Sequence, residues 1–418
     1  MSGQTISEKI LSRAAGHGVR AGEIAICAPD FAMGTDGSIP MALDYLRQMQ
    51  AAPAAPAHPE RLLFALDHYG AASGARALAL QEQVRSYARA HGVPLLEAGA
   101  GIGHQIVLES GLARPGRLMV GADSHAVSYG AANAFAAGIG SSDLAGLMFC
   151  GQIWLKVPET LRIVFTGSLR QDASAKDVAL FLARTLGSDG ANYLALEFSG
   201  SGVRTLDMDD RIVLANMSVE MGAKAGLFPC DEVTRDWLQG RTQAPYESVV
   251  ADSDAAYAGT INIDLDMIVP QIALPDRVDN VVDLCDAPST RIDVVYLGTC
   301  TGGRIKDYRE ALDALKQGGG VAPGVTLVVT PASETIRAEL ERSGVLAEFT
   351  ALGAHIQPPG CGSCCGTCGM IPADNTNVIS TANRNFKGRM GNGQAAIFLA
   401  SPRACAAAAS HGAIGRTA

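Results

Sequence analysis

Short runs of β-branched and apolar residues alternate with amphipathic stretches, and this alternation limits the possible architecture more than any other feature. The expected strands lie at 161–166, 292–298, 325–330 and 395–400. The expected helices lie at 175–186, 306–317, 334–344 and just after residue 400. Strands that alternate with helices are typical of α/β folds, in which crossover helices connect parallel strands.

The chain has 418 residues, which is long for one hydrophobic core. We therefore expect two or three domains. One strand–helix series ends and another begins near 160 and near 285, which divides the chain into 1–160, 161–285 and 286–418. Ser174 and Asp177 stand in capping-box spacing at the start of the helix expected after residue 174.

The formal net charge of -9 argues against a nucleic-acid-binding surface. The N-terminal residues carry no apolar core of the kind that a secretory signal requires, so we expect a cytoplasmic protein. The weakly polar segment 129–149 contains Asp143 and several glycines. It is predicted to be a buried helical segment and not a membrane span.

The cysteines are distributed unevenly. Cys361, Cys364, Cys365 and Cys368 fall within eight residues of a Gly- and Pro-rich loop, and Cys300 directly follows the expected strand 292–298. A C-x₂-C pair with one distant cysteine gives three thiolates. Three ligands on a four-iron cluster leave one iron open to bind a substrate.

Spacing alone leaves other interpretations open. Cys365 or Cys368 could complete a four-ligand structural zinc site. A redox-active C-x-x-C pair, or thiols without a metal, also fit the pattern.

Polar residues interrupt apolar sequence in four further segments. The acid–base candidates there are Asp67, His68, His104, Asp123, His125 and Glu220. Asn216 and Glu220 are spaced i, i+4, which places them on one face of a predicted helix. A carboxylate beside a histidine raises the pKa of the histidine, so such pairs suit proton transfer near neutral pH. For any one of these residues, a capping or core role is the alternative.

Arg384 and Arg389 lie in the segment STANRNFKGRMG. Guanidinium groups bind carboxylates through two parallel hydrogen bonds, so this loop could hold an acidic substrate. An exposed surface loop is the alternative interpretation.

Several short motifs occur together in order: LDH at 66–68, HQ at 104–105, DSH at 123–125, GTCT at 298–301, GCGSC at 360–364 and NRNFKGR at 383–389. Along nearly its whole length the chain thereby resembles the aconitase superfamily, in particular the large subunits of 3-isopropylmalate dehydratase and homoaconitase. The resemblance implies three α/β domains around a 4Fe–4S cluster, without the fourth, swivelling domain of full-length aconitases.

The resemblance also implies residue roles. Cys300, Cys361 and Cys364 would ligate the cluster, with Asn216 and Asn383 close to it. Asp67–His68, Asp123–His104 and Glu220–His125 would be acid–base pairs. Ser124, Arg384 and Arg389 would contact the substrate.

The activity implied is a hydro-lyase that moves water on a small hydroxy di- or tricarboxylic acid, with a separate small subunit supplying the swivelling domain and the catalytic base. We favour 3-isopropylmalate, and hence leucine biosynthesis, over homoaconitate, citrate or a methylated malate. An iron-responsive RNA-binding protein or a zinc-stabilised non-catalytic protein are alternatives of a different class. Gly302 and Ala126 stand where the family usually has Asn and Thr, and Cys365 and Cys368 are additional thiols.

Overall fold

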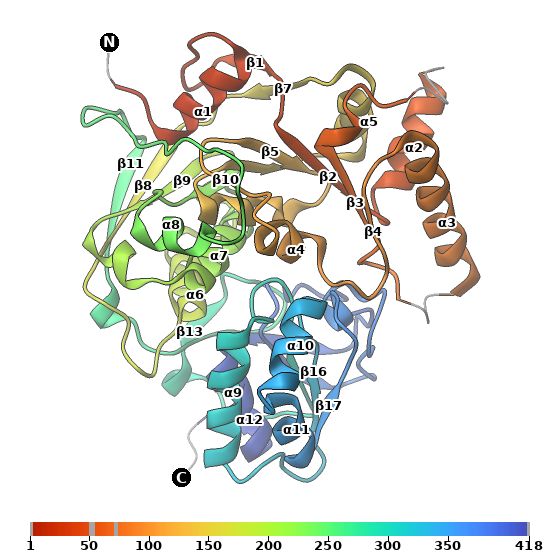
Figure 1. The fold of residues 1–418 in the computed structure, drawn as a ribbon. Coiled ribbons are helices and arrows are strands. Elements are labelled where there is room, and N and C mark those ends of the chain that lie inside the picture. Colours follow the sequence, from red (N-terminus) through yellow and green to blue (C-terminus); the bar gives the residue numbers. More distant parts are fainter. Residues whose placement is uncertain (1–2, 50–54, 71–73, 416–418) are drawn as a thin grey trace.

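The protein was examined as a computed structural model that describes residues 3–49, 55–70 and 74–415. Three main sheets follow one another along the chain, and helices cover them (Figure 1). The mixed α/β architecture expected from the alternating pattern is confirmed.

The first sheet has the strand order β4-β3-β2-β5-β6, and all its pairings are parallel. Its strands are β2 (Phe31–Thr35), β3 (Leu62–Ala65), β4 (Leu95–Leu96), β5 (Leu118–Gly121) and β6 (Phe135–Gly138). The helices of this region are α1 (Ile6–Ala15), α2 (Ile39–Gln48), α3 (Gly74–His91), α4 (Gly103–Glu109) and α5 (Ser141–Cys150). An antiparallel ribbon of β1 (Ile24–Cys27) and β7 (Ile153–Lys156) lies beside it.

The second sheet has the order β10-β9-β8-β11 and is also parallel. It consists of β8 (Thr160–Thr166), β9 (Ala195–Ser199), β10 (Ala225–Leu227) and β11 (Gly259–Asp264). Its helices are α6 (Ala175–Leu186), α7 (Met208–Met217) and α8 (Glu232–Leu238).

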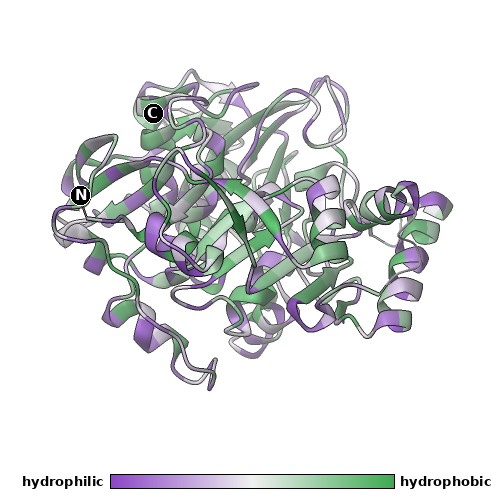
Figure 2. Ribbon diagram, turned by 90° about the horizontal axis from the view of Figure 1, so that it is seen from above, coloured by the Kyte–Doolittle hydropathy of each residue, from purple (hydrophilic) through white to green (hydrophobic). Residues whose placement is uncertain are grey.

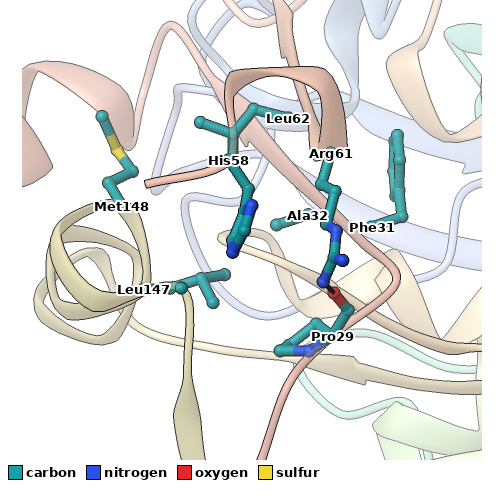
Figure 3. Close-up of a pocket in the computed structure, with 9 residues that line it drawn as sticks. Pro29, Phe31, Ala32, His58, Arg61, Leu62, Leu147 and Met148 are labelled. Atoms are coloured by element: carbon teal, nitrogen blue, oxygen red, sulfur yellow. Dashed lines mark hydrogen bonds between the residues drawn. The ribbon is translucent and has the colours of Figure 1, made fainter. Parts of the chain in front are cut away.

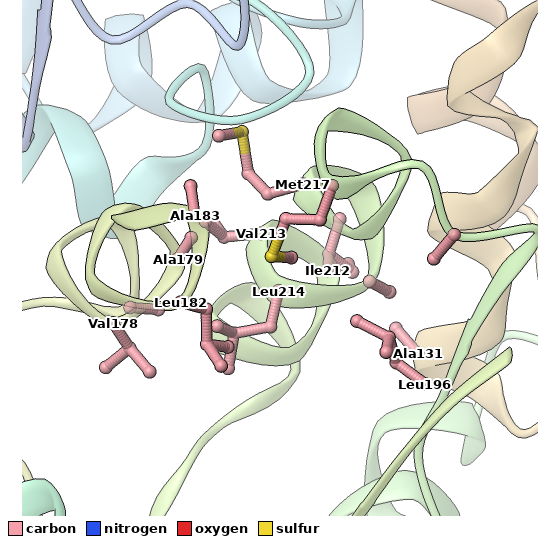
Figure 4. Close-up of a cluster of buried hydrophobic side chains, with 14 of the residues drawn as sticks. Ala131, Val178, Ala179, Leu182, Ala183, Leu196, Ile212, Val213, Leu214 and Met217 are labelled. Carbon is pink, nitrogen blue, oxygen red and sulfur yellow. The ribbon is translucent and has the colours of Figure 1, made fainter. Parts of the chain in front are cut away.

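Helices α6 and α7 pack against each other through aliphatic side chains. Val178, Leu182 and Ala183 of α6 lie near Val213 and Met217 of α7 in one buried cluster (Figure 4). Burying such side chains contributes about 1.5–3 kcal/mol for each large one. The expected capping box of Ser174 and Asp177 begins α6, which confirms the predicted helix start.

The third sheet has the order β13-β12-β19-β18-β15-β16-β17. Its strands are β12 (Gln271–Ala273), β13 (Val281–Asp283), β15 (Val294–Leu297), β16 (Thr326–Val329), β17 (Ala354–Ile356), β18 (Asn377–Ser380) and β19 (Ala396–Ala400). The strands from β15 to β19 pair in parallel, whereas β12 and β13 are antiparallel. Its helices are α9 (Ile305–Gln317), α10 (Glu334–Arg342), α11 (Val345–Ala351) and α12 (Pro402–His411). Two short strands, β14 (Thr290–Arg291) and β20 (Ala413–Ile414), pair nearby.

The second sheet begins close to the expected limit at 160, whereas the third sheet begins before the expected limit at 285. β8 begins at Thr160, while β12 and β13 lie before residue 285 and join the third sheet. The boundaries near 160 and 285 stay a prediction.

The prediction of one helical segment over 129–149 is wrong. This stretch contains the end of the 3-10 helix η2 (Ser124–Ala132), the strand β6 and most of α5. Most of its apolar residues are buried in three different elements, while Phe149 at its end is exposed. A short apolar run does not by itself distinguish strand from helix. In the described ranges, the structure contains no helix long and apolar enough to span a membrane. Hydrophobic colouring follows the inner strands, and polar colouring is most prominent on the outlying helices (Figure 2).

Candidate active site

One wall of the candidate site is the carboxyl edge of the first sheet. Asp67 and His68 follow β3, and Asp123 follows β5, where its side chain caps η2. His104 lies in the first turn of α4. Neighbouring parallel strands end at the same edge, which is where open α/β sheets bind ligands. Residues far apart in the sequence therefore meet here.

The opposite wall is the carboxyl edge of the third sheet. Cys300 follows β15 and Asn383 follows β18. The loop after β17 carries Cys361 and leads into the 3-10 helix η7 (Gly362–Cys365), which contains Cys364. The loops after β15, β17 and β18 thus deliver the three predicted cluster ligands and an amide to one place.

The two walls line a cavity with about 80 Å³ of room for the centres of water-sized molecules. It is lined by His68, Ile102, His104, Asp123, His125, Thr299, Cys300, Cys361, Cys364, Cys365, Asn383, Arg384 and Arg389. The remaining predicted residues contact this lining from behind: Asp67, Ser124, Asn216 and Glu220. The structure brings every predicted site residue to the cavity or directly behind it.

His68 is held between two carboxylates. Its Nδ1 lies 2.7 Å from Asp67 Oδ1, and its Nε2 lies 3.4 Å from Asp123 Oδ2. Burial opposes the charged form, but the charge of Asp67 and the hydrogen bonds with Asp123 and Asp67 outweigh it. The pKa of His68 is therefore raised well above its ordinary value. A protonated imidazole is available near neutral pH.

Asp123 serves all three histidines of the site. Its Oδ1 lies 2.9 Å from His104 Nε2 and accepts the backbone N–H of His125 at 2.8 Å. Burial would raise the pKa of Asp123, but hydrogen bonds with His104, His125 and His68 hold it well below its usual range. The carboxylate therefore stays charged and fixes the orientation of the histidine rings.

The third pair joins the first sheet region to the second, and Arg384 ties it to the loop after β18. His125 Nε2 lies 3.0 Å from Glu220 Oε1. Arg384 Nε donates to both oxygens of Glu220 at 2.8 and 2.9 Å, and its Nη2 donates to Ser124 Oγ at 2.9 Å. Burial would raise the pKa of Glu220, but His125 and Arg384 lower it overall.

The three thiols lie in a dry environment. Burial raises the pKa of Cys300 to about 12, raises that of Cys361 well above its ordinary value and raises that of Cys364. The Nδ2 atoms of Asn216 and Asn383 lie 3.1 and 3.3 Å from Cys300 Sγ and can donate to it. Without an added cation, the thiols stay protonated at neutral pH; a bound metal favours the thiolates.

Arg389 completes the lining. Its Nη2 lies 3.8 Å from Cys364 Sγ, and its guanidinium packs over the ring of Phe386 at 5.6 Å. Its Nε is buried and has no hydrogen-bond partner among the described residues. A buried donor without a partner is costly, so this atom favours an acceptor in the cavity.

A comparison with protein families gives one match: the model described as "Aconitase family (aconitate hydratase)" matches residues 8–412. The chain belongs to the aconitase family. Proteins of this family bind an iron–sulfur cluster. The fold and the motif resemblance are thus confirmed, while the individual residue roles stay predictions.

Curated relatives of this aconitase-family chain are similar over nearly their whole length. The 3-isopropylmalate dehydratase large subunit 1 of Thermotoga maritima is 42% identical over 411 residues, which cover 97% of both chains. The homoaconitase large subunit of Thermus thermophilus is 40% identical over 414 residues, covering 97% of this chain and 96% of the relative. Among solved structures, Thermococcus kodakaraensis aconitase X in its holo form matches with a TM-score of 0.51. At 13% identity over 86% of this chain and 84% of that one, it supports the fold alone.

Sequence reasoning missed three residues of this aconitase-family site. Tyr129 lies with its hydroxyl 2.8 Å from His104 Nδ1. Asp36 accepts the backbone N–H of His68 at 3.0 Å. Lys176 is fully buried in α6 and donates to the carbonyl oxygens of Thr381 and Ala382 at 2.9 and 2.6 Å. Asp36 could have been found, because it follows the strand β2 just as Asp67 follows β3.

The prediction that one helix carries both Asn216 and Glu220 is wrong. α7 ends at Met217, and Glu220 lies in a separate 3-10 helix, η4 (Ser218–Met221). Both side chains nevertheless reach the site, since Asn216 contacts Cys300 and Glu220 contacts His125. The tighter 3-10 turn changes the direction of Glu220, which spacing in the sequence does not reveal.

The unusual Gly302 has a packing reason. A Cβ atom added there would lie 2.3 Å from Thr381 Cβ. The Thr381 hydroxyl donates to the Gly298 carbonyl at 2.9 Å and accepts its N–H at 3.0 Å, so this side chain is fixed. Thr381 fills the space that a larger residue at position 302 would need. Ala126 is fully buried beneath the carboxyl edge of the first sheet.

A separate small hollow, with about 10 Å³ of room for the centre of a water-sized molecule, lies between the start of β2, the segment around His58 and α5 (Figure 3). Phe31, Leu62, Leu147 and Met148 make its lining mainly apolar. It shares no residue with the cavity between the sheets and has no thiol or carboxylate in its lining.

Proposed function

We propose that this chain is the cluster-bearing large subunit of a hydro-lyase that reversibly dehydrates a small hydroxy di- or tricarboxylic acid. One observation carries the proposal. Three thiols, three histidine–carboxylate pairs and two arginines converge on one cavity. They come from the carboxyl ends of parallel strands in the first and third sheets, and Glu220 comes from η4 in the second sheet region. Acid–base groups and anion-binding groups are what the elimination of water from a carboxylic acid requires.

The thiols suit a cluster better than one ion. Within the described ranges, Asp67, His68 and Cys361 form the one group of His, Cys, Asp and Glu whose ligand atoms all lie within 4.8 Å of one another. The Sγ atoms of Cys300, Cys361 and Cys364 are therefore spread more widely than this. A tetrahedral ion with Zn–S bonds of ~2.3 Å would bring its sulfurs to roughly 3.8 Å. This wider spacing supports a 4Fe–4S cluster held by three cysteines.

The amides beside Cys300 support the same assignment. Hydrogen bonds from Asn216 and Asn383 to the Cys300 sulfur would stabilise its thiolate. When bound, a 4Fe–4S cluster with three cysteine ligands would supply an open iron as a Lewis acid for the substrate hydroxyl.

His68 is the proton donor that this geometry favours. It faces the cavity, keeps its proton because of Asp67 and Asp123, and so can protonate a leaving hydroxyl. His125, paired with Glu220, is the second candidate. His104 is bound by both Asp123 and Tyr129, which suits a role in holding Asp123 in place.

Arg389, Arg384 and Ser124 would bind the carboxylates. The Arg389 Nε has no partner among the described residues and is free for a substrate oxygen. Arg384 is anchored by Glu220 through Nε and directs Nη2 to Ser124. Fixing the substrate carboxylates would align the departing hydroxyl with the proton to be removed.

The base that removes the carbon-bound proton would come from a separate small subunit. The relatives are named large subunits, and this chain covers 96–97% of the first two. We therefore expect the chain alone to be inactive and the pair of subunits to be active.

We favour 3-isopropylmalate as the substrate, because the Thermotoga maritima relative is a 3-isopropylmalate dehydratase large subunit at 42% identity. Homoaconitate is the alternative that a specific observation supports, since the Thermus thermophilus relative is 40% identical. Citrate and methylated malates remain in the assay for comparison.

The test is anaerobic purification of the chain alone and together with its small subunit, followed by iron and sulfide analysis and hydration assays on all four acids. About four iron and four sulfide per chain, with turnover only in the complex, would support the proposal. Zinc without labile sulfide, or RNA retention by the cluster-free chain in a filter-binding assay, would instead favour the alternatives of a different class.

A further inference from the structure

The cluster loop carries two thiols that the proposed function does not use. Cys365 and Cys368 are spaced C-x-x-C, and their Sγ atoms lie 3.6 Å apart. Both are partly exposed, whereas Cys364 is buried. The pair therefore lies beside the proposed cluster ligands but is open to a small reagent.

The loop backbone holds these two thiols face to face. Gly366 and Gly369 adopt positive φ angles of 70° and 73°. A side chain at Gly366 would lie 2.5 Å from the backbone N of Gly391, and one at Gly369 would lie 2.7 Å from that of Ser363. Glycine alone fits both turns, so the close approach of the thiols is built into the loop.

Each thiol also contacts a carbonyl of the active site. Cys368 Sγ can donate to the carbonyl oxygen of Gly362, at 3.0 Å, which lies between the ligands Cys361 and Cys364. Cys365 Sγ lies 3.7 Å from the carbonyl oxygen of His68. A change in bonding between the two sulfurs would act on the backbone that positions the cluster ligands.

We propose that Cys365 and Cys368 form a reversible disulfide with a small disulfide oxidant, and that this modification weakens retention of the cluster. One thiolate attacks a sulfur of the oxidant, forms a mixed disulfide and releases the first thiol. The other cysteine thiolate then attacks the mixed disulfide and releases the second. Two electrons and two protons pass from the pair to the oxidant, and one S–S bond replaces another.

The closed form requires the sulfurs to move from 3.6 Å to ~2.05 Å. Closure also removes the S–H donor from the Gly362 carbonyl, so the loop between Cys361 and Cys364 loses an anchor. The inference rests on the proposed function in one respect: a bound cluster keeps Cys361 and Cys364 out of the exchange.

The experiment uses the cluster-loaded complex under anaerobic conditions with oxidised glutathione. Free thiols are blocked with N-ethylmaleimide, disulfides are then reduced and labelled with iodoacetamide, and peptide fragmentation locates each label. We expect the iodoacetamide label on Cys365 and Cys368, faster release of iron to a chelator, and reversal of both by a dithiol.

Variants separate the pair from other thiols. In Cys365→Ser or Cys368→Ser, the remaining cysteine should retain a glutathione adduct because its partner is absent. Cys150→Ser, which removes an exposed thiol outside the loop, should behave as the parent chain does. Such a pattern would assign the exchange to the two loop cysteines.

If N-ethylmaleimide labels Cys365 and Cys368 in the oxidised parent chain, both thiols were free and the disulfide proposal is wrong. If oxidation leaves the rate of iron release unchanged, the disulfide does not affect retention of the cluster. A chain without iron and sulfide would instead refute the proposed function. In that case the label positions still report whether Cys365 and Cys368 pair with each other.

Discussion

The two walls of the cavity differ in how complete they are. On the acid–base wall, His68, His104 and His125 each lie within 3.0 Å of a carboxylate, and Asp123 unites them. On the sulfur wall, burial raises the thiol pKa values and the Arg389 Nε has no partner among the described residues. The histidines and carboxylates of the first wall find their partners within the chain. The thiols and Arg389 of the second wall call for a bound metal and a bound anion. Variants on the two walls should therefore fail in different ways.

Cys364→Ser is the most severe test of the sulfur wall. Losing a Lewis acid worth several kcal/mol should lower turnover by roughly 10³-fold or more. Iron content should fall in parallel, measured on protein purified anaerobically with the small subunit. Cys150→Ser is the matched control. Full iron content with metal-independent turnover in the variant would contradict the assignment of Cys364.

Asp67→Asn tests the acid–base wall and leaves all three proposed thiol ligands in the chain, although Asp67 lies close to Cys361. Removing the charge beside His68 should lower turnover by about 10²–10⁴-fold, which is the usual contribution of a positioned acid. Iron and sulfide content should stay at the parent level. Equal losses of iron and turnover would show that the two walls are not separable.

The pH profile sharpens this distinction. Because the pKa of folded His68 is raised, proton donation should be intact below that pKa and decline as pH rises through it. Protonated His68 also stabilises the folded state. This stabilisation is complete below the ordinary histidine pKa and is lost as the pH rises through the raised pKa of the folded state. In Asp67→Asn the alkaline decline in kcat should move to lower pH. If the alkaline side of the kcat–pH profile does not move, His68 is not the proton donor.

Arg389→Lys keeps the charge but not the two parallel hydrogen bonds. We expect a loss in kcat/KM of about 10–100-fold, equal to the loss of one good charge-assisted interaction. Steady-state kinetics should show the loss mainly in KM if Arg389 binds substrate and transition state alike. Arg337→Lys on α10, a partly exposed arginine paired with Glu334 and Glu341 outside the cavity, is the control.

Gly302→Asn should have the smallest effect and act on packing. The added side chain would collide with Thr381, which typically destabilises a protein by about 1–3 kcal/mol. The melting temperature of the cluster-loaded chain should fall, and adding Thr381→Ala should restore part of it. No recovery in the double variant would mean that Thr381 is not the obstacle.

The positions of the strand ends could be predicted because they depend on local sequence. Apolar runs followed by LDH, DSH or GTC place Asp67, Asp123 and Cys300 at carboxyl edges, and β3, β5 and β15 confirm those positions. The parallel arrangement then follows from the alternation of strands and helices.

Contacts between side chains of different loops were beyond the sequence. That Asp123 serves three histidines depends on how the loops at one edge of the first sheet fold together. The break between α7 and η4 depends on tertiary packing overriding helix propensity. Lys176 looked like an ordinary lysine in the first turn of α6. Only the fold shows that its ammonium group is buried against the loop after β18.

The order of these parts along the chain has a consequence for biosynthesis. The strands of the acid–base wall lie within residues 31–138, whereas two of the three proposed iron ligands follow residue 360. A ribosome that has translated the chain as far as Thr301 has made Cys300 but neither Cys361 nor Cys364. A cluster held by all three thiols must therefore wait until Cys364 has been translated, when the histidine side of the pocket already has its full sequence and can fold to receive the cofactor.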